Sequence, residues 1–413
     1  MNHAILRSKR DERKFVFMNR LKSVFKEDSK FGLLFLSILL SGLGYGIHKG
    51  LIDNYLAEVV VMGEFERGVA EFFRELPGLL LVFILAVFFT LSAENLYKIG
   101  AVIMLIGMGL LSLVSPTKVL VTLAICLYSL GEHIQLGMKG TMTLNYAKPG
   151  MGGRALGYQG SVQQVGTLVG YFVIIIALSL IAKNTPYKLF FGVAAVFTAM
   201  SMLMSFGLTT KSETDKTKSR FYFRKKFTKY YMLEVFYGAR KQVFFTFGPY
   251  VLILFYGASA TVISILYAVT AITSFFLSPV VGRIIDKAGY KIVMIMDTII
   301  LVAVCFFYGF AHHIFPMNVA FIICCVNYVL DSIISLASMA SSVYVQDISD
   351  SQEEVKATLS TGISVNHLIT IFIALFGGWI WQTLGMETLF ILSAVLGLCN
   401  SAYAATIKVK KAE

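Results

Sequence analysis

The sequence predicts an all-α polytopic membrane protein with twelve transmembrane helices in two pseudo-symmetric six-helix bundles. Of its 413 residues, 57% are hydrophobic and 15% are charged, against about 45–50% and about 25% in an average soluble domain. The apolar residues form blocks of about 20, which is the length that a helix needs to cross a bilayer. A long basic stretch divides these blocks into two sets of six.

Charged stretches divide the chain into five expected segments. They are a basic cytoplasmic N-terminal segment, a first six-helix bundle, a cytoplasmic central loop, a second six-helix bundle and a cytoplasmic tail, at 1–30, 31–208, 209–229, 230–407 and 408–413. Residues 1–30 lack the apolar run of a signal peptide. They form either an amphipathic helix on the membrane surface or a solvated tail. The apolar blocks run approximately over 31–48, 69–92, 96–115, 118–145, 157–182, 187–208, 230–256, 259–282, 290–311, 317–345, 357–383 and 387–407.

The prolines support these block boundaries. Pro116, Pro186 and Pro316 fall in short connections, where a residue without a backbone N–H does not interrupt a helix. Three more fall inside blocks and predict kinks, which neighbouring helices make tolerable in a membrane. These are Pro77, Pro249 and Pro279.

Lysine and arginine predict the orientation of the chain. With the N-terminus inside, the inside segments hold 27 of the 36 basic residues and the outside segments hold 5. This bias places both termini in the cytoplasm. We expect a multi-pass protein of the plasma membrane. We also expect it to be a monomer that contacts the lipid bilayer. Membrane topology also explains the net charge of +12. The basic and aromatic residues that alternate in the central loop anchor it to the membrane, and we expect no nucleic-acid binding.

The sequence carries no pattern that indicates catalysis. It has no phosphate-binding Gly-Lys-Ser/Thr loop, no H-E-x-x-H and no G-x-S-x-G. Its five cysteines lie in apolar blocks without metal-ligand spacing, and His312 and His313 are adjacent in a predicted outside turn without a third ligand. We therefore expect no enzyme, no cofactor and no metal site. A membrane-embedded enzyme or receptor is the competing class.

A short motif lies between the eighth and ninth blocks. Residues 282–291 read GRIIDKAGYK, a segment that resembles the G-x-x-x-D-[RK]-x-G-x-[RK] loop of the major facilitator superfamily. The resemblance implies a transporter that works by alternating access, in which this loop helps to hold one state. We expect its glycines to permit a tight turn and its aspartate to cap a helix and pair with basic neighbours. The gating-loop residues are Gly282, Asp286, Lys287, Gly289 and Lys291.

The resemblance places a central cavity between spans 1, 4, 7 and 10, and the ionisable residues of the apolar blocks are concentrated on these spans. Such a group costs about 2.5–3.5 kcal/mol at bilayer depth, so it needs a partner, water or a function. Glu132 in span 4 and Asp331 in span 10 are 199 residues apart, which is also the offset of the two bundles. We expect these carboxylates to face each other across the cavity and to carry the coupling proton. His133 either titrates with them or serves packing.

Arg240 and Lys241 in span 7 are the predicted substrate anchors. Adjacent residues point about 100° apart on a helix, and Arg240 is favoured because a guanidinium holds a carboxylate with two parallel bonds. The alternative is a structural salt bridge from Arg240 to Glu132 or Asp331. The predicted substrate-binding residues are Arg240, Lys241, Glu132, Asp331, Asn327 and Tyr45.

Span 2 opens with Glu71, Arg74 and Glu75. Their i, i+3, i+4 spacing places them on one helix face as an ion-pair set. They belong either to an outer gate or to a solvated helix end.

We predict a proton-coupled secondary transporter for a small organic anion or zwitterion, in which the two bundles rock about a central site. The alternative is a proton-coupled exporter of cationic or amphipathic compounds, with Glu132 and Asp331 binding the cation and Arg240 organising them. Two departures from the drug antiporters of the family weigh against this alternative. Span 5 has no Gly-Pro signature, and span 4 carries Glu132, His133 and Lys139 in place of an arginine.

Overall fold

The computed structural model describes residues 23–27, 29–88, 90–181, 185–209 and 223–407. Within these ranges the structure is helical, apart from one isolated antiparallel bridge between Phe25 and Ala147. Residues 1–22, 210–222 and 408–413, which hold most of the expected surface helix, the central loop and the tail, lie outside the described part. The helices are α2 (Phe31–Glu58), α3 (Glu64–Val87), α4 (Ala93–Leu113), α5 (Lys118–Tyr146), α6 (Gly152–Leu180), α7 (Tyr187–Phe206), η1 (Lys225–Phe227), α8 (Thr228–Leu254), α9 (Ala260–Ala288), α10 (Tyr290–Ile314), α11 (Met317–Ile334), η2 (Ser335–Ser338), α12 (Met339–Ile348) and α13 (Gln352–Ala405).

These described helices give twelve membrane spans. Each of α2 to α10 supplies one span, α11 continues through η2 and α12 as a tenth, and α13 supplies two because its backbone leaves the helical conformation at Gly385 (φ 88°). Most of them are long and apolar enough to cross a membrane. The helices α3 and α8 are as long but carry more ionisable residues. The all-α, twelve-span fold expected from the sequence is confirmed.

Local sequence explains most helix ends. Ser92, Thr117 and Ser259 precede α4, α5 and α9, and each side chain accepts a hydrogen bond from a backbone N–H in the first turn. Pro186 and Pro316 precede α7 and α11, as their predicted place in connections requires. The three prolines predicted to lie inside spans do so in α3, α8 and α9.

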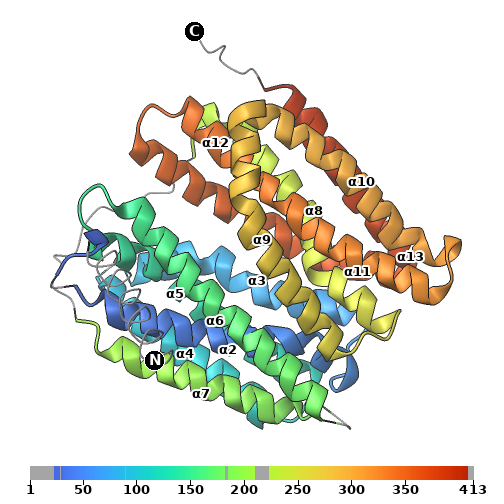
Figure 1. Cartoon of the computed structure of the whole chain (residues 1–413), viewed down its shortest axis with the longest axis horizontal. Helices are drawn as coiled ribbons and strands as arrows, with labels where there is room; N and C mark the ends of the chain where they lie inside the picture. The colour runs from blue at the N-terminus through green and yellow to red at the C-terminus, as the bar shows by residue number, and fades with distance from the viewer. Residues whose placement is uncertain (1–22, 28, 89, 182–184, 210–222, 408–413) are drawn as a thin grey trace, which may run out of the picture.

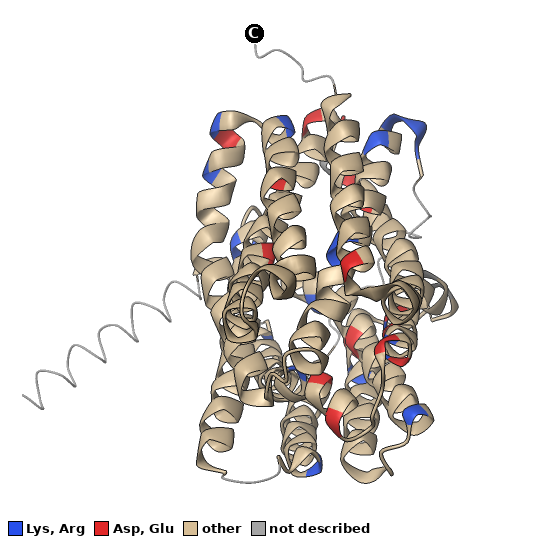
Figure 2. Ribbon diagram, turned by 90° about the vertical axis from the view of Figure 1, so that its right-hand side faces the viewer, with Lys and Arg blue, Asp and Glu red and all other residues tan. Residues whose placement is uncertain are grey.

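The first two helices reach further than the sequence indicates. The first apolar block ends at residue 48, but α2 runs on to Glu58, and α3 begins at Glu64 instead of 69. The sequence places Lys49 and Arg67 among the five outside basic residues, but the structure places them inside helices, with side chains only 12% and 4% exposed. The physical reason is that both pair with the buried Asp53, so their charges do not end the membrane-embedded helices. Figure 2 shows such charged residues midway along helices as well as at helix ends.

The chain forms two halves that repeat one helix order. We call α2–α7 the N-terminal half and α8–α13 the C-terminal half (Figure 1). The equivalent helices α5 and α11 begin at Lys118 and Met317, 199 residues apart. Within the N-terminal half, α2 and α6 pack so closely that a Cβ at Gly46, Gly166 or Gly170 would overlap the backbone of the other helix. Gly166 and Gly170 are four residues apart, so they lie on one face of α6 and allow the two helices to approach closely.

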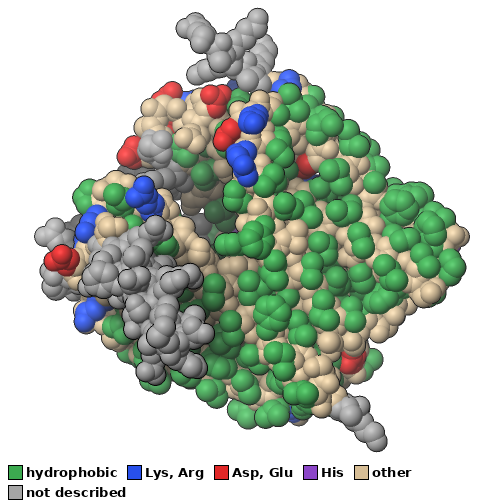
Figure 3. Space-filling model, in the orientation of Figure 1, with side chains coloured by type: hydrophobic (Ala, Val, Ile, Leu, Met, Phe, Trp, Pro, Cys, Tyr) green, Lys and Arg blue, Asp and Glu red, His purple; other side chains and the backbone are tan. Residues whose placement is uncertain are grey.

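The two halves touch at one end and diverge at the other. In the described ranges seven hydrogen bonds join them, and each involves an N-terminal-half residue between 50 and 75, in the later part of α2, the early part of α3 or the connection between them. We call this contact the closed end. At the opposite end, where α2 and α8 begin, Figures 1 and 3 show the halves apart, with a hollow between them.

The last residues of the N-terminal segment are not solvated. Val24 and Phe25 are 2% and 1% exposed, and Phe25 stacks on Phe31. Lys26 N–H donates to the backbone carbonyl of Tyr146, and Lys148 N–H donates to that of Val24. For these described residues the solvated-tail alternative is wrong, because the short antiparallel pairing seals the start of α2 against the end of α5.

Candidate functional site

Two adjoining pockets lie in the N-terminal half, beside the C-terminal half. Tyr45, Tyr128 and Glu132 line both pockets. The larger pocket also meets Phe245 of α8. We call the two pockets together the central cavity. Tyr45 and Glu132 therefore lie where the sequence predicts, in the wall of a cavity.

A network of alternating charges closes one side of the central cavity. It consists of three cations and three carboxylates, so its formal charge is zero. Asp53 accepts from Lys49 (3.0 Å) and Arg67 (3.0 Å), and Arg67 also donates to Glu71 (2.9 Å). Glu71 accepts from Arg74 (2.6 Å), which in turn contacts Glu75. We call these six residues the paired-charge network: Lys49, Asp53, Arg67, Glu71, Arg74 and Glu75.

This network also forms the closed end. Tyr267 Oη donates to Asp53 (2.6 Å), and Gln242 Nε2 donates to Glu71 (3.0 Å), so two helices of the C-terminal half hold carboxylates of the N-terminal half. Glu71 is fully buried and Glu75 is 6% exposed. The ion-pair set expected in span 2 is thus present, and the alternative of a solvated helix end is wrong.

Glu132 and Lys139 are the charges of the central cavity that have no counter-ion in contact. Glu132 is half-buried in the wall of both pockets and makes no hydrogen bond or ion pair within the described ranges. Lys139 lines the smaller pocket and donates to the neutral amide of Gln163 (2.6 Å). The sequence places both on one face of α5, two turns apart, but the predicted substrate-binding set omits Lys139. An unpaired anion and an unpaired cation on one wall can bind a ligand that carries both charges.

Two neutral polar side chains are also unsatisfied. Both ring nitrogens of His48 and the hydroxyl of Tyr128 are buried without a hydrogen-bond partner among the described residues, and both side chains line the larger pocket. Their rings are 4.9 Å apart. Buried polar groups normally find a partner, so this pair can bind polar groups of a ligand. Adjacency to Lys49 in span 1 is the one sequence signal for His48.

Arg240 does not face the central cavity. It is 1% exposed, and its Nη2 donates to Asp297 of α10 (2.9 Å). Arg240 lines neither pocket in this state, so its role as substrate anchor stays a prediction, and the predicted structural pair exists with a different partner. Asp297 lies inside the apolar block at 290–311, which is the one sequence signal that it needs a partner. Its pairing with Arg240 depends on how α8 packs against α10, which the sequence does not specify. Lys241, the next residue, is exposed and has no ion pair in the described structure.

Asp331 is also enclosed in the C-terminal half. It is 7% exposed, its Oδ1 has no hydrogen-bond partner within the described structure, and the nearby cations are Arg240 and Lys241. Asn327 donates to its own helix, at the carbonyl of Ile323 (2.8 Å). Asp331 therefore does not face Glu132 across either pocket, contrary to the expectation, although the two residues hold equivalent places in α5 and α11.

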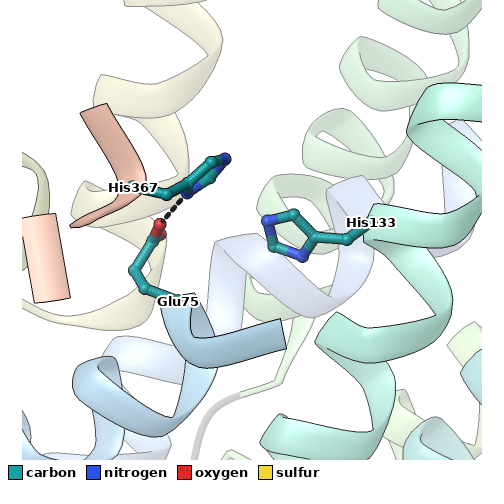
Figure 4. A group of neighbouring side chains, drawn as sticks. All are labelled: Glu75, His133 and His367. Carbon is teal, nitrogen blue, oxygen red and sulfur yellow. Dashed lines mark hydrogen bonds and ion pairs between the residues drawn. The ribbon is translucent and has the colours of Figure 1, made fainter. Parts of the chain in front are cut away.

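His133 lies at the contact of the two halves. Its Nδ1 is 2.8 Å from the carbonyl oxygen of Ser129, and its ring centre is 5.2 Å from that of His367 in α13. His367 Nδ1 is 2.8 Å from Glu75 (Figure 4). Packing thus joins three residues from three helices, a group that sequence spacing cannot reveal.

The other histidine pair also differs from the expectation. His312 and His313 lie in the last turn of α10, not in a loop, and Glu387 of α13 is 3.3 and 3.0 Å from their Nε2 atoms. The third potential ligand that the sequence does not show is therefore present.

The motif at 282–291 is mostly helical. The helix α9 continues to Ala288, so Gly282, Asp286 and Lys287 lie in its last turns, and only Gly289 (φ 85°) makes the tight turn. Asp286 is exposed near the C-terminal end of α9 and caps no helix N-terminus, so the predicted cap is wrong. Lys291 donates to the carbonyl of Ile407 (2.9 Å), which ties the turn to the end of α13.

Ion pairs outside the membrane spans lie at the helix ends. Lys226 of η1 donates to Asp350 (2.6 Å), and this hydrogen bond raises the pKa of Lys226. At the opposite end, Lys118 in the first turn of α5 donates to Glu66 in the first turn of α3 (2.7 Å). Both pairs are exposed and neither touches the central cavity.

Comparison with known proteins gives a fold for the chain and a family match for its C-terminal half. The family model described as Major Facilitator Superfamily matches residues 230–412. The solved nucleoside transporter NupG has a TM-score of 0.71 at 16% identity, with 92% of this chain and 99% of that one covered. A POT family transporter in complex with 5-aminolevulinic acid gives 0.70 at 11% identity (90% and 94% covered), and the D-xylose-proton symporter gives 0.69 at 13% (91% and 96%). A search of curated proteins gives no match.

Proposed function

We propose that the chain is a proton-coupled secondary transporter of the major facilitator superfamily and that it carries a small zwitterion. The observation that carries the substrate class is the pair Glu132 and Lys139, which line the central cavity without a counter-ion in contact. Arg240 is paired inside the C-terminal half, so it is not available to anchor an organic anion in this state. A zwitterion is therefore favoured over an organic anion as the substrate.

We assign each charge of the substrate to one residue of α5. Seven residues separate Glu132 from Lys139, which is about 10 Å along a helix. A substrate whose ammonium group binds Glu132 and whose carboxylate binds Lys139 is therefore longer than a simple α-amino acid. A shorter substrate fits if both flexible side chains turn towards it. The structurally similar POT family transporter was solved with 5-aminolevulinic acid, which carries one amine and one carboxyl group.

Proton coupling is proposed for the buried charges of the C-terminal half. Asp297 and Asp331 are both close to Arg240, but only Asp297 forms the ion pair. When Asp331 carries a proton, it is neutral, and the charge of Arg240 is balanced by that of Asp297 alone. Loss of the proton adds a second carboxylate that competes for Arg240 and favours rearrangement of α10 against α11.

Alternating access follows from the two ends of the molecule. The positive-inside bias assigns the diverging end to the cytoplasm, so this structure is inward-facing with its closed end outside. Moving to an outward-facing state requires the seven cross-half hydrogen bonds to break while the diverging ends come together. Rigid-body rocking of the halves is the usual form of this motion.

An exporter of cationic compounds is the second candidate. Glu132 also favours this function, because a carboxylate without a counter-ion attracts a cation. Lys139 on the same wall opposes it, since a like charge lies close to the bound cation.

A thermal-shift screen of the purified protein separates the two candidates. The compounds are dipeptides, 5-aminolevulinic acid, amino acids, organic anions, sugars and lipophilic cations. A ligand at a hundredfold excess over its Kd stabilises the native state by about 2.7 kcal/mol. We expect a zwitterion to raise the unfolding temperature of the unmodified protein and to raise that of Glu132→Gln or Lys139→Gln clearly less at the same concentration.

The matched control is Lys188→Gln. Lys188 is exposed and lines neither pocket, so this variant should keep the shift in unfolding temperature. A shift produced by a lipophilic cation, lost in Glu132→Gln and kept in Lys139→Gln, would replace the zwitterion by the exporter.

A further inference from the structure

Three potential metal ligands meet where the two halves touch. They are Glu75 of α3, His133 of α5 and His367 of α13, and one ligand atom from each lies within 4.8 Å of the other two. Glu75 and His133 are buried, and the His367 side chain is 19% exposed. Figure 4 shows the three side chains directed towards a common space between their helices.

The group is already oriented for coordination. Nδ1 of His133 bonds to the backbone carbonyl (2.8 Å) and approaches the hydroxyl (3.1 Å) of Ser129, which leaves Nε2 with its lone pair free. Metal-bound histidines commonly donate their other ring N–H to a carbonyl in this way. Gly78 keeps the space open, because a Cβ there would lie only 2.7 Å from Nε2 of His133 and 2.9 Å from the His367 ring.

We propose that Glu75, His133 and His367 bind a divalent transition-metal ion, with Zn²⁺ the best match. Two imidazole nitrogens and one carboxylate oxygen form a ligand set typical of zinc, with water in the fourth position. Calcium and magnesium prefer oxygen-only sites, so the set also selects against the commonest divalent ions. The ion takes the place of the direct Glu75–His367 hydrogen bond.

The charges nearby permit a divalent ion at this place. Glu75 can use one oxygen for the metal while the other stays with Arg74, as in the structure. The paired-charge network is neutral overall, and the unpaired Glu132 is adjacent to His133 in sequence and acts on it electrostatically. The added positive charge is therefore partly compensated.

The site predicts inhibition of transport by the metal. Two ligands belong to the N-terminal half and one to the C-terminal half, so the ion fastens the closed end. An outward-facing state must separate α13 from α3 and α5, and this motion breaks the coordination. The inference goes beyond the proposed function, because it does not depend on the identity of the substrate.

The test uses the full-length purified protein with CoCl₂ and ZnCl₂ as probes. We expect one bound ion per chain, a visible ligand-field spectrum of Co²⁺ with nitrogen ligands, and a higher unfolding temperature in Zn²⁺. His133→Gln and His367→Gln should each weaken binding by more than about a hundredfold, since loss of a mere outer partner costs 10–100-fold.

The matched control is His313→Gln, which removes a histidine from the other His–His–Glu group of the described residues. Binding that persists in both His133→Gln and His367→Gln but disappears in His313→Gln would overturn the proposal. So would a protein that folds normally and shows no Zn²⁺-dependent shift.

A second measurement tests the fastening. Val119 and Met317 are exposed in the first turns of the equivalent helices α5 and α11, one in each half. Spin labels at these positions in a cysteine-free background report the distance across the closed end. Zn²⁺ should narrow this distance distribution to its short component, and His367→Gln should abolish the change. A distance distribution that becomes broader or shifts to longer distances in Zn²⁺ would contradict the proposal that the ion holds the closed end together.

Discussion

The same place in the two halves carries the same chemistry in different surroundings. Glu132 in α5 and Asp331 in α11 each lie fourteen residues after the first residue of their helix. Glu132 lines the central cavity without a counter-ion in contact, whereas Asp331 is buried near Arg240 and lines neither pocket. The difference indicates that pseudo-symmetry determines the position of the acidic residue along its helix. The packing of neighbouring helices determines whether that residue lines the cavity or lies beside a charged side chain of the protein.

The largest expected effect is in the C-terminal half. Arg240→Ala leaves Asp297 buried and unpaired, and breaking one partner of a buried pair typically costs about 3–5 kcal/mol. We expect a large drop in the unfolding temperature of the purified protein. Adding Asp297→Asn should restore much of the loss. An Arg240→Ala protein with normal stability and no ligand binding would show that Arg240 is a substrate anchor after all.

The equivalent change in the N-terminal half should have the opposite character. Glu132→Gln removes a charge that has no ion-pair partner, so unfolding should occur at the same temperature or slightly higher. Ligand affinity should fall at least about tenfold, the effect of losing one hydrogen bond to a charged group. Calorimetric titration with the zwitterion from the screen measures it, and a Glu132→Gln protein that binds normally would remove this residue from the site.

Two lysines sharpen the comparison further. Lys139 lines the cavity beside Gln163, whereas Lys241 is exposed beside the buried charges of the C-terminal half. Lys139→Gln should weaken zwitterion binding about tenfold, and Lys241→Gln should change it less than about twofold. The order is measured by the same titrations. A reversed order would return the anion-binding role to Lys241, as the sequence predicts.

The smallest effect is expected at the exposed pair of Lys226 and Asp350. Their hydrogen bond raises the pKa of Lys226 above its usual value of 10.5. Stabilisation from this pair is therefore complete at neutral pH and disappears only as strongly alkaline pH removes the proton from the folded protein. Lys226 also donates to the buried Glu354 (3.2 Å), which keeps a second cation, Arg224, at 3.4 Å. Lys226→Gln should therefore change the unfolding temperature at pH 7 only slightly, because exposed ion pairs contribute little. A marked drop would show that η1 is a fixed part of the C-terminal half.

Periodic and additive features of this protein can be predicted from its sequence. Hydrophobic blocks give the twelve spans, and the 199-residue offset gives the equivalence of α5 and α11. The i, i+3, i+4 spacing identifies the ion pairs of Glu71, Arg74 and Glu75. Each of these depends on neighbours along one helix or on counting residues.

Contacts between helices could not be predicted in the same way. Asp297 is the partner of Arg240 because of the register between α8 and α10, which no local pattern specifies. The sequence assigns Lys49 and Arg67 to outside segments, because their shared ion-pair partner Asp53 is apparent only in the structure. The group of Glu75, His133 and His367 draws on three helices and both halves, so its members have no common spacing.

The most direct test of the division between the halves is binding of the zwitterion to Glu132→Gln and Asp331→Asn at several pH values. We predict that Glu132→Gln weakens binding at least about tenfold at every pH, whereas Asp331→Asn binds with nearly normal affinity but loses the proton dependence of the unmodified protein. Lost binding in Asp331→Asn, together with normal binding in Glu132→Gln, would contradict the assignment of substrate to the N-terminal half and of the proton to the C-terminal half.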